Sequence, residues 1–167
     1  TAMKVGLQLL TELEIPMAAE SITREALIRQ MKQITDSSII PEAGIMGEAH
    51  ASVTVWSQEL TVFLGYNNYQ LLSDLCDWYD CREHWTYRTK QQGTDIVHGT
   101  YINLIGATTP KLLQTTLPLD AIGGGLTGRM ILVFEMVRAK DAPLLFITPE
   151  TMRLYGNLIG DLRIILE

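Results

Sequence analysis

Two short apolar runs rich in β-branched residues, at 51–56 and 101–106, constrain the fold of this chain more than any other feature. Runs of this length and composition are typical of buried strands. Between them lies a helical pattern of apolar residues: Tyr69, Leu71, Leu72, Leu75 and Trp78. A third continuous apolar run, at 130–134, also has the character of a buried strand. Strands that alternate with helices predict an α/β fold with a mostly parallel sheet.

The rest of the chain divides into further helices and turns. Apolar spacing predicts a buried helix over 2–13, and Thr148 followed by a proline predicts the start of a terminal helix that runs to Leu166. Thr23 is a candidate cap for a helix that begins at Glu25. The other expected elements are a short strand at 15–19, a loop or hairpin at 35–50, a helix that ends at Gly65, a loop or small hairpin at 80–99, a short helix at 111–116 and a turn at 123–125.

Composition and charge limit the classes of protein. Hydrophobic residues make up 47% of the 167 residues and charged residues 19%, which is typical of one packed domain. The net charge of −6 provides no global positive field, so DNA contacts are expected only in local patches or in other segments. No apolar run reaches the roughly 18 residues needed to cross a bilayer, and no basic-then-apolar leader is present. We expect a soluble intracellular protein without membrane contacts.

Two cysteines and two histidines, Cys76, Cys81, His84 and His98, fall within one stretch. Two cysteines are too few for a disulfide scaffold. Their Cys-x4-Cys spacing with one nearby histidine does not match the usual zinc pattern, in which ligand pairs are more closely spaced. We therefore expect no zinc site at these residues.

Glu59 follows the first predicted strand and is a candidate catalytic residue. In nucleotide hydrolases an acidic residue at the carboxyl end of a buried strand faces the phosphates, where it can orient water or a metal ion. The alternative is a solvent-facing glutamate in the first turn of a helix, which the helix dipole favours. The local pattern is compatible with both interpretations.

A polar residue near the end of the second strand is a candidate sensor of a γ-phosphate. Asn103 lies inside that strand, and Thr108 and Thr109 follow it before Pro110. The alternative for these threonines is ordinary turn chemistry ahead of a proline.

Arg129 ends a Gly-rich stretch, 123–128, immediately before the third apolar run. A guanidinium delivered by a mobile loop can bind phosphoryl oxygens bidentately, as an arginine finger does. The alternative is an ion pair between Arg129 and a surface carboxylate.

In their order, these segments resemble the ATPase domain of phage and plasmid primase-helicase proteins, which are P-loop NTPases. The likeness covers nearly the whole chain and rests on five stretches: 20–27 (ESITREAL), 53–60 (VTVWSQEL), 85–93 (WTYRTKQQG), 102–110 (INLIGATTP) and 124–129 (GGLTGR). It implies a RecA-like three-layer sandwich with a mostly parallel sheet over 1–138 and a C-terminal helical segment over 139–167. It also implies that the first strand and a phosphate loop ending in Gly-Lys-Ser or Gly-Lys-Thr lie just upstream of Thr1.

The resemblance assigns roles to individual residues. Glu59 would be the catalytic glutamate, Asn103 or Thr108 the sensor, and Arg129 the finger that reaches a neighbouring subunit's nucleotide. Thr1 and Gln58 would lie beside the bound ATP. Gln58 stands where P-loop enzymes usually have a magnesium-orienting aspartate, and a neutral amide cannot supply that charge. We therefore expect Mg²⁺ binding to depend on the upstream loop and on water-mediated contacts, and hydrolysis to be weak or lost.

The resemblance also implies partners. ATP hydrolysis would be coupled to unwinding or remodelling DNA during phage or plasmid replication, in a homo-oligomer such as a ring and in the cytoplasm of a bacterial host. Arg88 and Lys90 are candidates for a nucleic-acid or intersubunit contact. Nearby rings could stack on single-stranded nucleic acid, and the alternative is that they pack in the core: Trp78, Tyr79, Trp85 and Tyr87.

Two other functions are compatible with the sequence. One is a catalytically inactive remnant or interaction module that keeps the scaffold without the phosphate loop. The other is a packaging-type motor ATPase of the same superfamily, whose nuclease domain would follow Glu167. Because a RecA-like sheet places the strand before the phosphate loop at its centre, we also expect this polypeptide on its own to be marginally stable or to aggregate.

Overall fold

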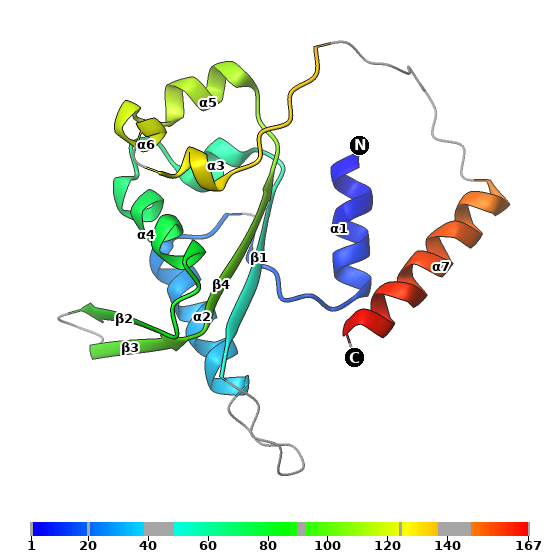
Figure 1. Ribbon diagram of the computed structural model, residues 1–167, viewed down its shortest axis with the longest axis horizontal. Coiled ribbons are helices and arrows are strands. Elements are labelled where there is room, and N and C mark those ends of the chain that lie inside the picture. Colours follow the sequence, from blue (N-terminus) through cyan, green and yellow to red (C-terminus); the bar gives the residue numbers. More distant parts are fainter. Residues whose placement is uncertain are drawn as a thin grey trace. The chain divides into compact units, whose positions relative to one another are not determined.

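The computed structural model of the chain describes residues 2–19, 21–38, 49–89, 93–123, 125–136 and 148–166 (Figure 1). The chain forms two compact units. The terminal unit consists of Thr1–Ile15 and Ile131–Glu167, and the sheet unit consists of Pro16–Met130. Every candidate site residue that the structure describes belongs to the sheet unit.

A short parallel sheet forms the centre of the sheet unit. Strand β1 (Ala51–Ser57) runs parallel to β4 (Thr100–Gly106), and the two strands are paired along their full lengths. On the other side of β1, Thr54 donates a hydrogen bond to Pro16 O (2.8 Å) and accepts one from Ala18 N (2.9 Å). The predicted strands at 51–56 and 101–106 and their parallel pairing are confirmed, whereas the predicted strand at 15–19 contributes a single parallel bridge.

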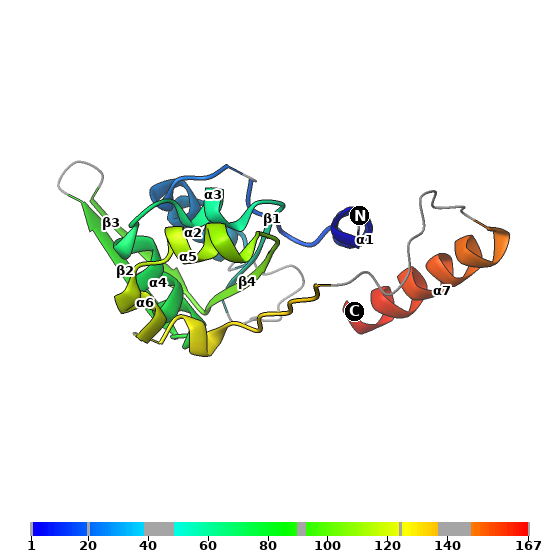
Figure 2. The ribbon, with the colours of Figure 1, turned by 90° about the horizontal axis from the view of Figure 1, so that it is seen from above.

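Helices α2 (Arg24–Ser38) and α4 (Tyr69–Tyr79) contact the sheet, and Figure 2 shows them on the same side of it. Three apolar side chains at helical spacing in α2 are fully buried: Leu27, Ile28 and Met31. As predicted, Thr23 caps α2, because its Oγ1 accepts a hydrogen bond from Ala26 N (3.2 Å). The helix is longer than expected and includes the first residues of the predicted loop at 35–50.

Short helices connect the strands. Helix α3 (Leu60–Leu64) follows β1, and α5 (Pro110–Thr116) follows β4, as the sequence predicts. Helix α6 (Leu119–Gly123) and the 3₁₀ helix η1 (Thr127–Arg129) then complete the sheet unit. The sequence does not predict α6, because five residues are too few to establish a helical period.

A hairpin of β2 (His84–Thr89) and β3 (Gly93–His98) is antiparallel and confirms the hairpin expected within 80–99. Alternate residues face inward, so Trp85 and the Val97 opposite it are buried. The Trp85 ring meets Trp78 of α4 edge-on, with centroids 5.4 Å apart. The two tryptophans therefore join the hairpin to the helical layer.

The apolar run at 130–134 does not form the buried strand that its composition predicts, and that prediction is wrong. Residues 130–135 are in neither a helix nor a strand. Ile131, Leu132, Val133 and Phe134 are 94%, 58%, 91% and 66% exposed. A strand needs a neighbour to bond its backbone and cover its side chains, and within the described ranges no strand pairs with this run.

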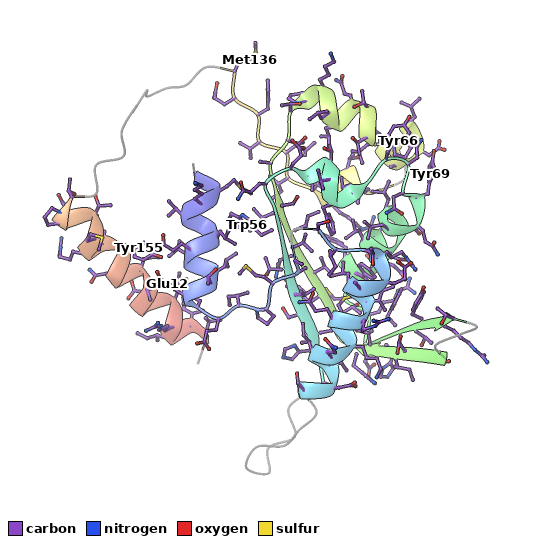
Figure 3. The ribbon with its side chains drawn as sticks, turned by 180° about the vertical axis from the view of Figure 1, so that it is seen from behind. Glu12, Trp56, Tyr66, Tyr69, Met136 and Tyr155 are labelled. Atoms are coloured by element: carbon purple, nitrogen blue, oxygen red, sulfur yellow. The ribbon has the colours of Figure 1, made fainter. Side chains whose placement is uncertain are left out.

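The terminal unit contains the helices expected at the two ends, α1 (Ala2–Glu12) and α7 (Pro149–Leu166). The predicted burial of the first helix is wrong, because every described side chain of α1 is intermediate or exposed. Thr148 caps α7, because its Oγ1 accepts a hydrogen bond from Thr151 N (3.1 Å). The side chain of Tyr155 in α7 lies towards Glu12 of α1 (Figure 3). Burial, and secondarily the Glu12 carboxylate, raises the pKa of Tyr155. No helix among the described residues is long and apolar enough to cross a membrane.

Candidate functional site

The candidate site lies where β1 and β4 end side by side. Ser57 is opposite Gly106 in the register, so the two carboxyl ends are level. Beyond them, Ala107 N donates to Ser57 O (3.1 Å), and Leu60 N donates to Ala107 O (2.8 Å). The loops that follow the two strands are therefore held together, at the edge of the sheet where ligands bind in open α/β folds.

Glu59 is the central side chain of this edge. Its Oε1 accepts hydrogen bonds from the Thr108 hydroxyl (2.6 Å) and the Thr61 hydroxyl (2.8 Å). These bonds, that from Thr108 first, lower the pKa of Glu59, since they stabilise the charged form. Glu59 is consequently a carboxylate at neutral pH, fixed in orientation by Thr61 in α3 and by Thr108 in the loop after β4.

The geometry is compatible with both interpretations of Glu59. As the N-cap of α3 it has extended backbone angles, φ −132° and ψ 93°, and its carboxylate also accepts a hydrogen bond from Thr61 N (3.4 Å). This corresponds to the structural alternative, a glutamate that stabilises a helix start. Within the described part of the chain all hydrogen bonds to this carboxylate end on Oε1, so Oε2 can still bind a water, a metal ion or another ligand.

Gly106 allows the two loops to approach closely. A Cβ atom built on Gly106 would lie 2.9 Å from Leu60 Cδ1 and 3.0 Å from Leu60 Cβ. Real carbon contacts of this kind are longer, so any side chain here would push α3 away from the end of β4. The glycine therefore contributes to the position of Glu59, which lies immediately before Leu60.

The two sensor candidates occupy different places. Thr108 lies beyond the strand end and bonds to Glu59, whereas Asn103 lies in the middle of β4, opposite Thr54. The side chain of Asn103 is exposed. The side chain of Gln58, in the loop after β1, is also exposed. Thr108 is thus the candidate that the fold brings to Glu59.

Arg129 is held by neighbours in the sheet unit. Its Nη2 donates to Asp80 Oδ1 (3.2 Å) and its Nη1 donates to Gly125 O (3.2 Å). The guanidinium also lies over the Tyr79 ring, 5.3 Å from the centroid. The hydrogen bond to Asp80 raises the pKa of Arg129. This arrangement is the ion pair with a surface carboxylate that the sequence offers as the alternative to an arginine finger.

The aromatic residues of the hairpin are engaged in packing. Trp85 stacks on Tyr87, with ring centroids 6.1 Å apart and planes 8° from parallel. The Arg24 guanidinium lies over the Tyr87 ring, 4.9 Å from its centroid. Core packing, the alternative to stacking on nucleic acid, is therefore what Trp78 and Trp85 do, while Tyr79 is exposed. Arg88 is exposed on β2, and Lys90 and Thr1 lie outside the described residues.

Arg24 and Asp74 form an ion pair that the sequence does not predict. Their side chains are 9% and 14% exposed, and Arg24 Nε contacts Asp74 Oδ2. Burial raises the pKa of Asp74, and the Arg24 cation opposes that rise. The short contact and the permanent charge of a guanidinium keep the pair ionised at neutral pH. It joins the start of α2 to the middle of α4, 50 residues apart, so no local signal could reveal it.

Among the residues that the structure describes, Cys76, Cys81, His84 and His98 do not form the four-ligand set that a zinc site would need. Within the described ranges there is no cluster of three or more side chains of histidine, cysteine, aspartate or glutamate suited to a metal ion. Cys81 Sγ instead donates to Tyr79 O (3.4 Å), and Cys76 is half-buried.

The sequence alone does not reveal which hydroxyl groups bind Glu59. Thr108 is identified as a sensor candidate, but not as a partner of Glu59, and Thr61 is not identified at all. The only local signal for Thr61 is its position two residues after a possible helix cap.

No protein-family model, no curated protein and no solved structure matches this chain. Its class is therefore stated from its own residues: it is an α/β protein with a carboxylate fixed where two parallel strands end.

Proposed function

We propose that this chain is most of an ATPase core of the phage and plasmid primase-helicase type, coupling ATP hydrolysis to the unwinding or remodelling of DNA. The observation that carries the proposal is the contact of Glu59 with Thr108 at the adjacent ends of two parallel strands. A residue that orients the attacking water must be ionised, and the lowered pKa of Glu59 meets this requirement.

A RecA-like sheet wider than the described one is part of this proposal. Gly99 O accepts from Ala51 N, and Ala107 N donates to Ser57 O, so odd-numbered residues of β4 bond towards β1. The backbone groups of Ile102 and Leu104 consequently face away from β1, because alternate residues bond on opposite sides. No strand in the described ranges pairs with this edge. A strand that precedes a phosphate loop would add at this edge.

The residues that would hold ATP and Mg²⁺ are few in the described part of the chain. Oε2 of Glu59 and the hydroxyl groups of Thr61 and Thr108 supply oxygen atoms near the strand ends. This donor set suits Mg²⁺, which usually binds one or two carboxylates and keeps several waters and phosphate oxygens. The sequence contains no Gly-Lys-Ser or Gly-Lys-Thr, so the proposal assigns most contacts to the phosphates to a loop upstream of Thr1.

Arg129 would act on a neighbouring subunit's nucleotide after leaving Asp80. Its guanidinium would then stabilise charge on the transferred phosphoryl group, which requires a homo-oligomer. Exposed Arg88 on the β2–β3 hairpin is the described candidate for contact with DNA, and Lys90 is the second candidate.

A non-hydrolytic interaction module is the second candidate function. Two observations favour it: Gln58 provides no charge beside Glu59, and Arg129 is already paired with Asp80. In this alternative Glu59 serves only as the cap of α3.

The experiment begins by sequencing the coding DNA upstream of the Thr1 codon and expressing the complete open reading frame. We expect an apolar strand and a Gly-rich loop that ends in Lys-Ser or Lys-Thr. The complete protein should bind and hydrolyse ATP, and Glu59→Gln should abolish turnover while binding is retained.

The matched control is Glu150→Gln, which removes the same charge from an exposed position in the first turn of α7. It should leave the rate unchanged. A complete protein that neither binds nor hydrolyses ATP would contradict the ATPase proposal. Binding without hydrolysis, with Glu59→Gln behaving like wild type, would favour the interaction module.

A further inference from the structure

His84 and His98 face each other across the β2–β3 hairpin. They are directly opposite in the antiparallel register, and their Nδ1 atoms are 2.9 Å apart, which is a hydrogen bond from the protonated Nδ1 of one ring to the bare Nδ1 of the other. A metal ion bound by both nitrogens would displace that proton. The rings meet edge to face, with centroids 4.7 Å apart and planes at 89°. This contact plays no part in the proposed ATPase site and is formed by nitrogen atoms that bind metal ions in many proteins.

The backbone explains why the two imidazoles come so close. Gly99 N donates to Glu83 O (2.9 Å), so Glu83 and Gly99, which lie next to the two histidines, form a hydrogen-bonded pair of the antiparallel ladder. His84 and His98 therefore form a non-hydrogen-bonded pair, in which opposite side chains are closer together. His98 N points away from β2 and donates instead to Thr35 Oγ1 of α2 (3.3 Å).

The hairpin beneath the two histidines is firmly anchored. The next pair along it, Trp85 and Val97, is buried on the opposite face. Trp85 Nε1 also donates to Asp77 Oδ2 of α4 (3.0 Å). Because the strands are held by the core, the backbone keeps the two histidines opposite each other before any ligand binds.

We propose that His84 and His98 form a binding site for one divalent transition-metal ion of the Cu²⁺ or Ni²⁺ type. An ion about 2.0–2.1 Å from each nitrogen would see the two Nδ1 atoms at an angle of about 90°. That angle matches adjacent ligands in square-planar or octahedral coordination, which Cu²⁺ and Ni²⁺ adopt. A tetrahedral Zn²⁺ site would need the nitrogens about 0.4 Å further apart.

The site has two protein ligands, and water completes the coordination. Within the described part of the chain no third histidine, cysteine or carboxylate joins the pair in a metal cluster. The carboxylate of Glu83 lies 3.6 Å from Nε2 of His84, on the side of the ring that does not face His98. A carboxylate at the second nitrogen orients a metal-binding imidazole. The side chain of His84 is 58% exposed, so solvent and metal ions can reach the pair.

The test is calorimetric titration of the 167-residue chain, prepared without an affinity tag, with NiCl₂, CuCl₂ and ZnCl₂. We expect one Ni²⁺ or Cu²⁺ per chain, bound more tightly than Zn²⁺. His84→Ala and His98→Ala should each weaken Ni²⁺ binding by at least about tenfold, because either change removes one of the two linked ligands. The double variant should bind Ni²⁺ at least as weakly as either single variant.

His50→Ala is the control for the third histidine of the chain, whose Cα lies beside Gly99 but whose side chain joins no group of three metal ligands among the described residues. It should bind Ni²⁺ like wild type. Pulsed electron paramagnetic resonance of Cu²⁺ on the wild-type chain provides a measurement that does not depend on how the variants fold, and it should detect two imidazole nitrogens. Equal affinity in wild type and both single variants, or one imidazole per Cu²⁺, would overturn the proposal.

Discussion

The hydroxyl of Thr108 donates a 2.6 Å hydrogen bond to Oε1 of Glu59, and so joins the loop after β4 to the loop after β1. The two residues are 49 positions apart in the sequence. They meet because β1 and β4 are parallel neighbours with level carboxyl ends. The contact fixes the orientation of the carboxylate and lowers its pKa at the same time.

Removing that hydroxyl should change the titration of Glu59. In Thr108→Val the pKa of the Glu59 carboxyl should rise towards the ordinary value of 4.5, because the largest stabilising bond to the charged form is lost. Carboxyl-carbon NMR shifts recorded against pH measure this directly. Thr115→Val, whose hydroxyl bonds to backbone carbonyls of its own helix, should leave Glu59 unchanged.

The same bond makes the stability of the fold depend on pH. The folded-state pKa of Glu59 lies below its unfolded value, so the stabilisation is present above about pH 4.5 and is lost as the pH falls through the folded pKa. Thr108→Val should therefore reduce the loss of stability between neutral and acid pH. Parallel pH profiles for the two proteins would contradict this role of Thr108.

Gly106→Ala should destabilise the sheet unit. The added methyl group would lie 3.0 Å from Leu60 Cβ, an atom attached directly to the backbone of α3, and overpacking of this kind costs about 1–3 kcal/mol. Urea unfolding at neutral pH measures the change in the free energy of unfolding. Gly160→Ala in α7 is the control, since nothing lies within 4 Å of its added Cβ, and it should be neutral or slightly stabilising. Equal midpoints for the two variants would rule out the close approach at Gly106.

Arg24→Met should lower the free energy of unfolding by about 3 kcal/mol, the low end of the range for breaking a buried ion pair, because it leaves Asp74 buried without its partner. The low end is expected because the side chain of Asp74 is 14% exposed, which lets water reach the carboxylate. The comparison is Lys32→Met, which breaks an exposed i,i+4 pair with Asp36 and should cost at most about 1 kcal/mol. Chemical denaturation of both variants measures these changes in the free energy of unfolding. Similar losses in the two variants would show that the Arg24–Asp74 pair stabilises the fold no more than an exposed pair does.

The exposed apolar run should cause self-association of this polypeptide. Replacing Ile131 and Val133, which are 94% and 91% exposed, with lysine should reduce light scattering at micromolar concentration, since charge opposes pairing of apolar extended segments. The unfolding midpoint should not fall, because neither side chain is buried. Leu119→Lys, at an isolated residue that is 85% exposed, should change scattering much less. If all three replacements act alike, the run has no special role in association.

The sequence by itself determined the elements whose signals are local. Helices α1, α2, α4 and α7 and strands β1 and β4 follow from apolar periodicity and from caps such as Thr23 and Thr148, all of which involve residues a few positions apart. It also identified Glu59 and Thr108 as separate candidates, because polar residues that follow apolar strands are visible without a structure.

Only the tertiary structure decided which of these residues meet. The bond from Thr108 to Glu59 and the pairing of Arg129 with Asp80 each span 49 residues, and the register of His84 with His98 depends on how the hairpin is closed. The run at 130–134 has a strand's composition, yet in the described structure it lacks a neighbour to bond its backbone. A paired strand, an ion pair or a ligand site needs a partner that lies far away in the chain. The local pattern of the sequence contains no information on which residue that partner is.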